Sequence, residues 1–401
     1  MEQSYAAALS EIMPERLRLC RYHAARRRFI PVDALPRPVA PAESPLRMSD
    51  KAEAFADESA GLGRRMEQSI RRWRRNAARA IYGSFGSTAD TAAFPDARRG
   101  DVLLLAGETW GQHDFAVLRA LRDHCGLHLA AVLQDMIPIK CPQFFEGGRF
   151  IERFRDYADF IATDTDLVLA ISETTEKDLE DYARTRGGVR SDLRTIELGH
   201  SGLESAGAKP LAQNLDPGRF VLCVSAFQSR KNIDLLYHVW RRLSEAGILD
   251  LPKLVLVGRR GFGGSDLLGQ IARDPVIRDS IAVFPGVSDP TLSWLYRNCA
   301  WTLYPSFYEG WGLPISESLS YGKYCLASNA PALVEAGQGL VGHLDPLDFV
   351  AWRDAVIELV GSPELIAAFE RKIKDRYRAV SWKQSAMRLV ELLQPLYETS
   401  A

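Results

Sequence analysis

Residues 301–323, WTLYPSFYEGWGLPISESLSYGK, are typical of a buried strand, a glycine loop and the start of a helix. The first four residues fit a short strand, which Pro305 ends. Gly310 and Gly312 follow, and Pro314 suits the first turn of a helix, where its missing N–H costs nothing. In such a unit the free backbone amides and the positive end of the helix point the same way. The stretch therefore predicts an anion-binding site.

Two carboxylates flank this predicted site. Glu309 lies in the loop and Glu317 lies one turn into the helix. Each residue alone is equally well explained without a ligand, Glu317 as a complement to the helix dipole and Glu309 as a solvated loop acid. Together they span a glycine loop at the end of a buried strand, where open α/β sheets bind ligands. The pair therefore favours a binding site.

Composition excludes several classes of protein. A chain of 401 residues with 46% hydrophobic and 25% charged residues is ordinary for a globular protein of two domains. No apolar run has the length of a membrane span, and the first residues, MEQSYAAALSEIMPE, contain no apolar signal-peptide core. The 6 cysteines are scattered, without a C-x-x-C pair. We expect a reducing cytoplasmic location and no structural zinc.

Positive charge gathers in residues 1–100, which hold 17 Arg and one Lys against 12 Asp and Glu, an excess of six. A basic stretch runs from Arg64 to Tyr82, with apolar residues on one stripe of a helix. The favoured interpretation is a surface helix with a solvated Arg face. The alternative is docking on anionic lipid headgroups, that is, peripheral association with the inner face of the membrane. No nucleic-acid partner is expected.

From residue 101 onward, apolar strands alternate with helical segments, which predicts parallel sheets of Rossmann type. The polar residues 206–218 predict a linker between a first domain (1–205, with 1–100 atypical) and a second domain (219–401). The last helix is a candidate to return to the first domain. Expected strands are 17–22, 28–32, 101–106, 127–133, 167–171 and 194–198, then 220–226, 253–257, 281–284, 301–304, 324–327 and 340–344. Expected helices are 5–12, 115–124, 150–160, 173–183, 233–246, 266–273, 291–298 and 315–321, and most of the chain after residue 346.

Two cations, Arg230 and Lys231, follow the expected strand 220–226 and precede a helix for which Asn232 is the predicted N-cap. Cations at a helix N-terminus oppose its dipole, at a cost of a few tenths to about 1 kcal/mol each, and a bound anion reverses that sign. Exposed and screened side chains are the alternative. Ser172 and Ser381 are predicted to cap two further helices, and Ser288 or Asp289 a third.

The segment YEGWGLPISE resembles the Glu-x7-Glu signature of retaining glycosyltransferases of the GT-B fold, in glycosyltransferase family 4. The resemblance implies an α/β protein of GT-B architecture, with two Rossmann-like domains facing across a cleft. It also implies that Glu309 contacts the donor sugar and Glu317 the nucleotide ribose. The amides between them would lie along the sugar and the diphosphate. These belong to Gly310, Trp311, Gly312 and Leu313.

Three further segments of the second domain resemble the same family. SAFQSRKNIDLL resembles the segment whose basic residues hold the donor diphosphate, a role that falls to Lys231 and Arg230. VFPGVSDPTLSWL resembles the loop that receives the nucleotide base around Val287, and VGRRGFGG places Gly258 near the donor. The family implies no protein nucleophile and no metal or other cofactor, so the nucleotide sugar is expected as substrate only.

The first domain resembles the family less closely. LAAVLQDMIPIKCPQFF carries Gln134 where the family usually has a histidine that contacts the donor sugar, which puts the sugar and the rate in question. Asp135 is expected to line the cleft on the acceptor side. The family also opens with a strand and a glycine loop that residues 1–30 do not match, so this first strand is expected to be missing.

The resemblance implies a hexosyltransferase-type enzyme (EC 2.4), which moves a sugar from a nucleotide diphosphate to a hydroxyl of a glycan or lipid-linked acceptor. Bacterial surface polysaccharide, such as lipopolysaccharide, is the expected product. The alternative is a donor-binding or scaffold protein of GT-B type with weak or no catalysis, because of Gln134 and the missing opening loop. A glycoside hydrolase that uses both glutamates is the least favoured interpretation, since it needs no phosphate site.

Overall fold

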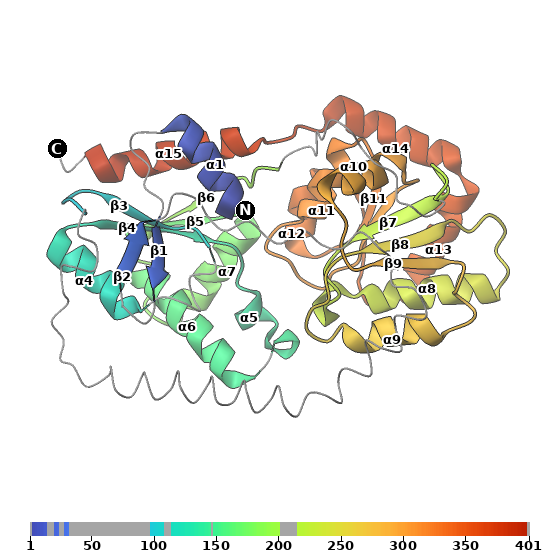
Figure 1. Ribbon diagram of the computed structural model, residues 1–401, viewed down its shortest axis with the longest axis horizontal. Coiled ribbons are helices and arrows are strands. Elements are labelled where there is room, and N and C mark those ends of the chain that lie inside the picture. Colours follow the sequence, from blue (N-terminus) through green and yellow to red (C-terminus); the bar gives the residue numbers. More distant parts are fainter. Residues whose placement is uncertain are drawn as a thin grey trace.

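The structure is a computed structural model, and it describes residues 2–13, 20–23, 28–31, 97–107, 114–145, 147–200 and 215–398. Within these residues the strands form sheets of two, four and six strands. Every strand pair that the structure describes in the two larger sheets is parallel. Figure 1 shows these two sheets side by side, each covered by helices. The predicted α/β class is confirmed.

The four-stranded sheet has the order β3-β4-β5-β6. Its strands are β3 (Val102–Leu105), β4 (His128–Leu133), β5 (Leu167–Ala170) and β6 (Asp192–Thr195). The helices between them are α4 (Phe115–Cys125), α5 (Ile137–Lys140), η4 (Pro142–Phe144), α6 (Gly148–Thr163) and α7 (Glu173–Ala183). β5 is buried along its whole length, as central parallel strands are when helices cover both faces.

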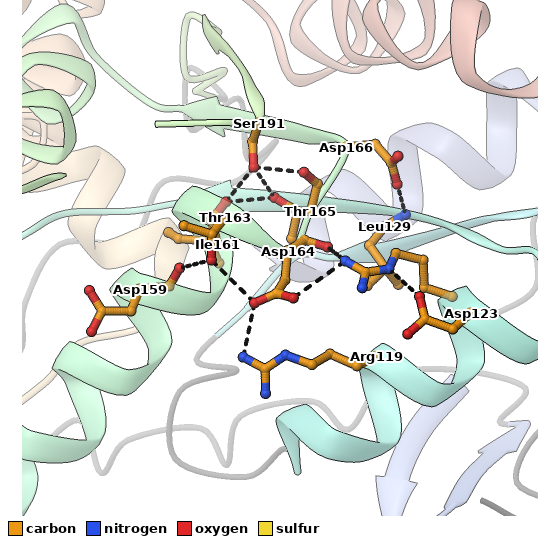
Figure 2. Close-up of polar contacts among 11 residues, drawn as sticks. Arg119, Asp123, Leu129, Asp159, Ile161, Thr163, Asp164, Thr165, Asp166 and Ser191 are labelled. Carbon is orange, nitrogen blue, oxygen red and sulfur yellow. Dashed lines mark hydrogen bonds and ion pairs between the residues drawn. The ribbon is translucent and has the colours of Figure 1, made fainter. Parts of the chain in front are cut away.

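A network of hydrogen bonds and ion pairs lies at the edge of this sheet where the strands begin (Figure 2). Arg119 of α4 forms an ion pair with Asp164, just after α6, at 2.9 Å. The Leu129 N–H donates to the Asp166 carboxylate at 2.7 Å. The Ser191 hydroxyl lies within hydrogen-bond distance of carbonyl oxygens near the end of α6 and just before β5. The network fixes the helices to the sheet and lies at the edge opposite the carboxyl ends of the strands.

The six-stranded sheet has the order β12-β11-β10-β7-β8-β9. Its strands are β7 (Phe220–Val224), β8 (Lys253–Val257), β9 (Ile281–Phe284), β10 (Thr302–Tyr304), β11 (Cys325–Ser328) and β12 (Gly342–Leu344). Its helices are η5 (Ser229–Lys231), α8 (Ile233–Glu245), α9 (Ser265–Arg273), α10 (Asp289–Asn298), α11 (Leu313–Ser320), α12 (Pro331–Gly337), α13 (Phe349–Gly361) and α14 (Pro363–Arg376). The strand order reverses direction between β7 and β10, which places a ligand-binding crevice at their carboxyl ends.

The first and last helices of the described chain pack together on the four-stranded sheet (Figure 1). α1 (Glu2–Ile12) and α15 (Trp382–Glu398) lie side by side there and share one apolar cluster with β4 and β5. Tyr5 of α1 bonds to Ser385 of α15 at 2.6 Å and packs edge-on against Trp382. The two predicted strands near the start of the chain are present as β1 (Cys20–His23) and β2 (Arg28–Pro31), and they pair antiparallel. The last helix of the chain therefore packs on the first sheet, although it follows the second domain in the sequence.

Most predicted elements are confirmed to within a few residues. The last strand of the first sheet, β6, lies two to three residues before its predicted position at 194–198, because Ile196 and Leu198 are buried against the α1 and α15 cluster instead of in the sheet. The short helices α5, α12, η4 and η5 were not predicted. The basic stretch from Arg64 to Tyr82 and most of the predicted linker 206–218 lie outside the described residues.

Candidate functional site

One cavity of 1070 Å³ lies between the carboxyl ends of the two sheets. It is lined by the ends of β4 and β5 from the first sheet and by the loops after β7, β8, β9 and β10 from the second. All of the site residues predicted from the sequence line this cavity: Gln134, Asp135, Arg230, Lys231, Gly258, Val287, Glu309, Gly310, Trp311, Gly312, Leu313 and Glu317. The structure brings these residues together, while the roles assigned to them stay predictions.

Glu309 lies between two cations. Its Oε1 accepts from Lys231 Nζ at 2.5 Å and from the Tyr304 hydroxyl at 3.1 Å, and its Oε2 accepts from Arg230 Nη1 at 2.7 Å. Glu309 and Lys231 are 7% and 8% exposed, so these charges are almost wholly removed from bulk water. Burial alone would raise the pKa of Glu309, but Lys231 and Arg230 outweigh it and lower that pKa to about 2. Burial lowers the pKa of Lys231, Glu309 opposes that change and Arg230 adds to it. With Lys231 protonated, the three groups together carry one net positive charge.

The backbone between η5 and α8 places these cations. Asn232 adopts the left-handed conformation there, with φ of 54°, which asparagine tolerates better than most residues. It is the N-cap residue of α8, as predicted, but its side chain makes no capping hydrogen bond to the helix. The amide donates instead to the carbonyl oxygens of Pro305 and Pro346, at 3.2 and 2.8 Å, and so ties η5 to the loops after β10 and β12. Asn232 therefore fixes the turn that directs Arg230 and Lys231 toward Glu309.

The glycine loop and the N-terminus of α11 form the wall beside these cations. Gly312 is the residue before the helix, no side chain caps this end, and Pro314 lies in the first turn as predicted. The backbone amides and the partial positive charge of the helix end therefore remain available at the cavity wall. A Cβ on Gly312 would lie 3.0 Å from Leu333 Cδ2, so this glycine also lets α11 pack closely on α12.

Residues of α10, α11 and the end of β8 also line the cavity. The predicted cap is confirmed, because Ser288 accepts from the Thr291 N–H at 3.4 Å at the start of α10. Gly258 lines the cavity, and its lack of a side chain has a packing reason, since a Cβ there would lie 1.8 Å from the Ser225 carbonyl oxygen. Burial raises the pKa of Glu317, a hydrogen bond from Tyr296 opposes that rise, and Asp289 adds to it.

The first sheet contributes Gln134 and Asp135 at the end of β4. Asp135 accepts from the Ile137 N–H at 2.9 Å, which fixes its carboxylate at the start of α5, and burial raises its pKa. Gly310 packs directly on this segment, since a Cβ there would lie 2.1 Å from the Gln134 carbonyl oxygen. The glycine loop of the second sheet therefore touches the first sheet through backbone atoms.

Further contacts hold the glycine loop and α12 against α7, and the sequence indicated none of them. Glu335 of α12 accepts from the backbone N–H groups of Glu173 and Thr174, at 2.8 and 3.2 Å, at the N-terminus of α7. This supplies a carboxylate from one half of the molecule to a helix end in the other, where the dipole favours it. Tyr308 donates to Asp178 of α7 at 2.7 Å. These contacts bring the two sides of the cavity together.

Comparison with known proteins agrees with this geometry. Residues 211–375 match the family described as "Glycosyl transferases group 1", which confirms the predicted resemblance over the second domain. The O-antigen chain mannosyltransferase B of Escherichia coli is 33% identical over 134 residues, which are 33% of this chain and 35% of that protein. The serotype-specific mannosyltransferase WbdA of Escherichia coli is 22% identical over 329 residues, 75% of this chain and 38% of that protein. The chain thus spans less than half the length of these relatives.

Two solved structures show the same fold. Sucrose-phosphate synthase from Thermosynechococcus elongatus superposes with a TM-score of 0.58 at 18% identity, over 75% of this chain and 74% of that one. Anabaena Alr3699/HepE in complex with UDP superposes with a TM-score of 0.55 at 17% identity, over 73% of this chain and 78% of that one. The predicted GT-B architecture is confirmed.

No helix among the residues that the structure describes is long and apolar enough to cross a membrane. No group of three or more His, Cys, Asp or Glu side chains among them is placed to hold a metal ion.

Proposed function

We propose that the protein is a retaining glycosyltransferase. The proposal starts from the second domain, which matches the glycosyl transferases group 1 family, and from the GT-B fold. In this proposal it moves a sugar from a nucleotide-diphosphate donor to a hydroxyl of a glycan or lipid-linked acceptor. The observation that carries the proposal is the group of Arg230, Lys231 and Glu309 beside the open N-terminus of α11, inside a cavity that both sheets line.

The cations and the helix end stabilise the leaving group in this proposal. Departure of a nucleoside diphosphate leaves negative charge on its terminal phosphate, and fixed positive groups in a water-poor site lower the barrier to that step. Lys231 and Arg230 supply full charges, and the backbone at Gly312 and Leu313 supplies partial ones. The proposal assigns no metal or other cofactor to this step.

Glu309 binds and orients the sugar in this proposal and is not the nucleophile. A carboxylate with a pKa of about 2, with both oxygens held by cations, is a weak base and a weak nucleophile. The acceptor hydroxyl then attacks the anomeric carbon on the face that the diphosphate leaves, and its proton passes to an oxygen of the departing diphosphate. The configuration at the anomeric carbon is retained. Glu309 forms ion pairs with the two cations, and an incoming diphosphate takes over part of that charge.

The relatives support a narrower proposal for substrate and pathway. Two of them are named as O-antigen chain mannosyltransferases and another as a serotype-specific mannosyltransferase, so a mannosyl donor and a role in surface polysaccharide synthesis are proposed. A lipid-linked acceptor would place the enzyme at the cytoplasmic face of the inner membrane as a peripheral protein.

The test is a panel of GDP-mannose, UDP-glucose and UDP-N-acetylglucosamine, incubated with the protein and a lipid-linked oligosaccharide acceptor. Release of nucleoside diphosphate and the anomeric configuration of the product by NMR are measured. Turnover of one donor with retained configuration supports the proposal. Inverted configuration contradicts the retaining mechanism. Tight binding of a nucleoside diphosphate with no turnover of any donor favours a donor-binding scaffold instead.

The two glutamates are expected to respond differently to the same change. Glu317→Gln should weaken binding of the bare nucleoside diphosphate roughly tenfold, because a carboxylate is a stronger acceptor for ribose hydroxyls than an amide. Glu309→Gln should leave that affinity unchanged or increase it, since it removes a negative charge beside the phosphates. Its turnover of the full donor should fall roughly 100-fold.

Isothermal titration calorimetry with the diphosphate and steady-state kinetics with the donor measure the two effects. Each variant is the matched control for the other, because both exchange a carboxylate for an amide in the same cavity. Equal loss of nucleotide affinity in both variants would show that the two carboxylates do not have separate roles.

A further inference from the structure

Tyr296 lies behind the cavity, on α10, and its hydroxyl donates to Glu317 Oε2 at 2.7 Å. The side chain is 1% exposed and its ring stacks on Tyr321, with ring centroids 5.4 Å apart and planes at 6°. A buried tyrosine hydroxyl needs a hydrogen-bond partner. Here that partner is a carboxylate that lines the cavity, although Tyr296 itself does not line it.

The hydrogen bond has a fixed direction. Burial and the charge of Glu317 raise the pKa of Tyr296 well above its usual value, so the hydroxyl stays protonated and always acts as the donor. Among the residues that the structure describes, no other side chain donates to the Glu317 carboxylate. One oxygen of Glu317 is therefore held from inside the protein, and Oε1 is left to accept from a ligand.

We propose that Tyr296 is a positioning residue that fixes the plane of the Glu317 carboxylate for recognition of the vicinal hydroxyls of a ribose. This inference rests on the proposed function, because it requires that the cavity binds a nucleotide. The two ribose hydroxyls are neighbouring donors, and a carboxylate held in one plane presents acceptor lone pairs to both. Without Tyr296 the carboxylate rotates more freely, and binding then costs the entropy of ordering it.

Tyr296 also favours the ionised form of Glu317. Burial raises the pKa of Glu317, Tyr296 lowers it, and the nearby carboxylate of Asp289 raises it. Tyr296 and Asp289, both on α10, are the titratable groups of the described chain that act on Glu317. Loss of the Tyr296 hydroxyl removes the lowering contribution, so Glu317 takes up its proton at a higher pH. Nucleotide binding, which needs the carboxylate, should then weaken at a higher pH than in the native protein.

The test compares Tyr296→Phe with the native full-length protein by calorimetry. The probes are UDP and GDP, with the 2′,3′-dideoxy diphosphate of whichever base binds more tightly. We expect Tyr296→Phe to weaken binding of the ribonucleotide about tenfold and to leave binding of the dideoxy nucleotide within about twofold. The acid limb of ribonucleotide binding should move to higher pH. The ratio of the two affinities is internal to each variant, so a loss of folded protein does not imitate the effect.

Tyr321→Phe is the matched control. It removes the hydroxyl of the ring stacked on Tyr296, and that hydroxyl donates to Ser293 and not to Glu317. The ratio of ribonucleotide to dideoxynucleotide affinity should stay at its native value in this variant. An equal loss of both affinities in Tyr296→Phe, or no loss of either, overturns the role of Tyr296. If no diphosphate binds to the native protein, the proposed function is overturned, and this inference with it.

Discussion

Lys231→Ala is expected to weaken binding of the nucleoside diphosphate by at least tenfold and to lower the melting temperature. The first effect follows from the loss of a charge that faces the phosphates, since hydrogen bonds to charged groups contribute roughly 1.5–3 kcal/mol. The second follows from Glu309, which keeps Arg230 but loses the cation 2.5 Å from its Oε1. A buried carboxylate with less compensation destabilises the folded state.

The same substitution removes the net positive charge of the site. The native group of Arg230, Lys231 and Glu309 carries one positive charge, and Lys231→Ala leaves it neutral. Glu309 then repels an incoming diphosphate without a second cation beside it. The pKa of Glu309 should rise from about 2, because Lys231 lowers this pKa more than Arg230 does. The contribution of Glu309 to stability is lost as the pH falls from its unfolded-state pKa to its folded-state pKa, so acid should destabilise the variant less than the native protein and over a narrower pH range.

Calorimetry with the bare diphosphate and thermal unfolding without ligand separate the two effects. The double variant Lys231→Ala with Glu309→Gln is the control, since it removes the uncompensated charge and not only the cation. Stability should return toward the native value in this variant, while the phosphate affinity stays below that of Glu309→Gln alone. An unchanged affinity in Lys231→Ala would place this side chain outside the phosphate site.

The sequence predicts much of the fold because most strands are short apolar runs with no competing pattern. The strands Lys253–Val257 and Ile281–Phe284 and the helix Glu173–Ala183 have their predicted bounds. In a parallel sheet with helices on both faces such runs are continuous, so their limits are easy to place. Helix α12 escaped prediction because it has only seven residues, PALVEAG, and its packing against α7 and α11 stabilises it.

The residues that line the cavity could be predicted from the sequence about as well as the strands and helices. These residues follow the ends of parallel strands, and those ends meet at one edge of each sheet, so local motifs are sufficient to place them together. The contacts between elements could not be predicted in this way. Tyr296 meets Glu317, and Glu335 meets the start of α7, only through the packing of separate elements. No periodicity or spacing in the chain records these pairs.

Gly310→Ala is expected to lower turnover of the donor roughly 10- to 100-fold while nucleoside diphosphate affinity changes much less. An added Cβ would lie 2.1 Å from the Gln134 carbonyl oxygen and 2.8 Å from Asp135 Cβ. The first of these is a backbone atom of the other half of the molecule, so no side-chain rotation relieves the clash. Forced overpacking costs about 1–3 kcal/mol, and each 1.4 kcal/mol removes a factor of about ten from the population of the closed arrangement.

The Gly310→Ala substitution opposes closure of the cavity. The Thr175 hydroxyl donates to the Gly310 carbonyl oxygen at 3.3 Å, and Glu335 of α12 caps the N-terminus of α7. If Gly310 cannot approach Gln134, the glycine loop and α12 must therefore both move. The phosphate and ribose contacts proposed for the second domain do not depend on that approach. Binding of the bare diphosphate is therefore expected to survive the loss of turnover.

Steady-state kinetics, calorimetry and the radius of gyration from small-angle scattering with the diphosphate bound provide the measurements. Gly361→Ala, at the end of α13, is the matched control, because no heavy atom lies within 4 Å of its added Cβ. This control should keep native turnover and native compactness, whereas Gly310→Ala should be more extended than the native protein. Native turnover in Gly310→Ala would mean that catalysis does not require the contact between the glycine loop and the end of β4. Equal loss of turnover and diphosphate affinity would mean that the substitution damages the binding loop itself and not the closure of the two domains.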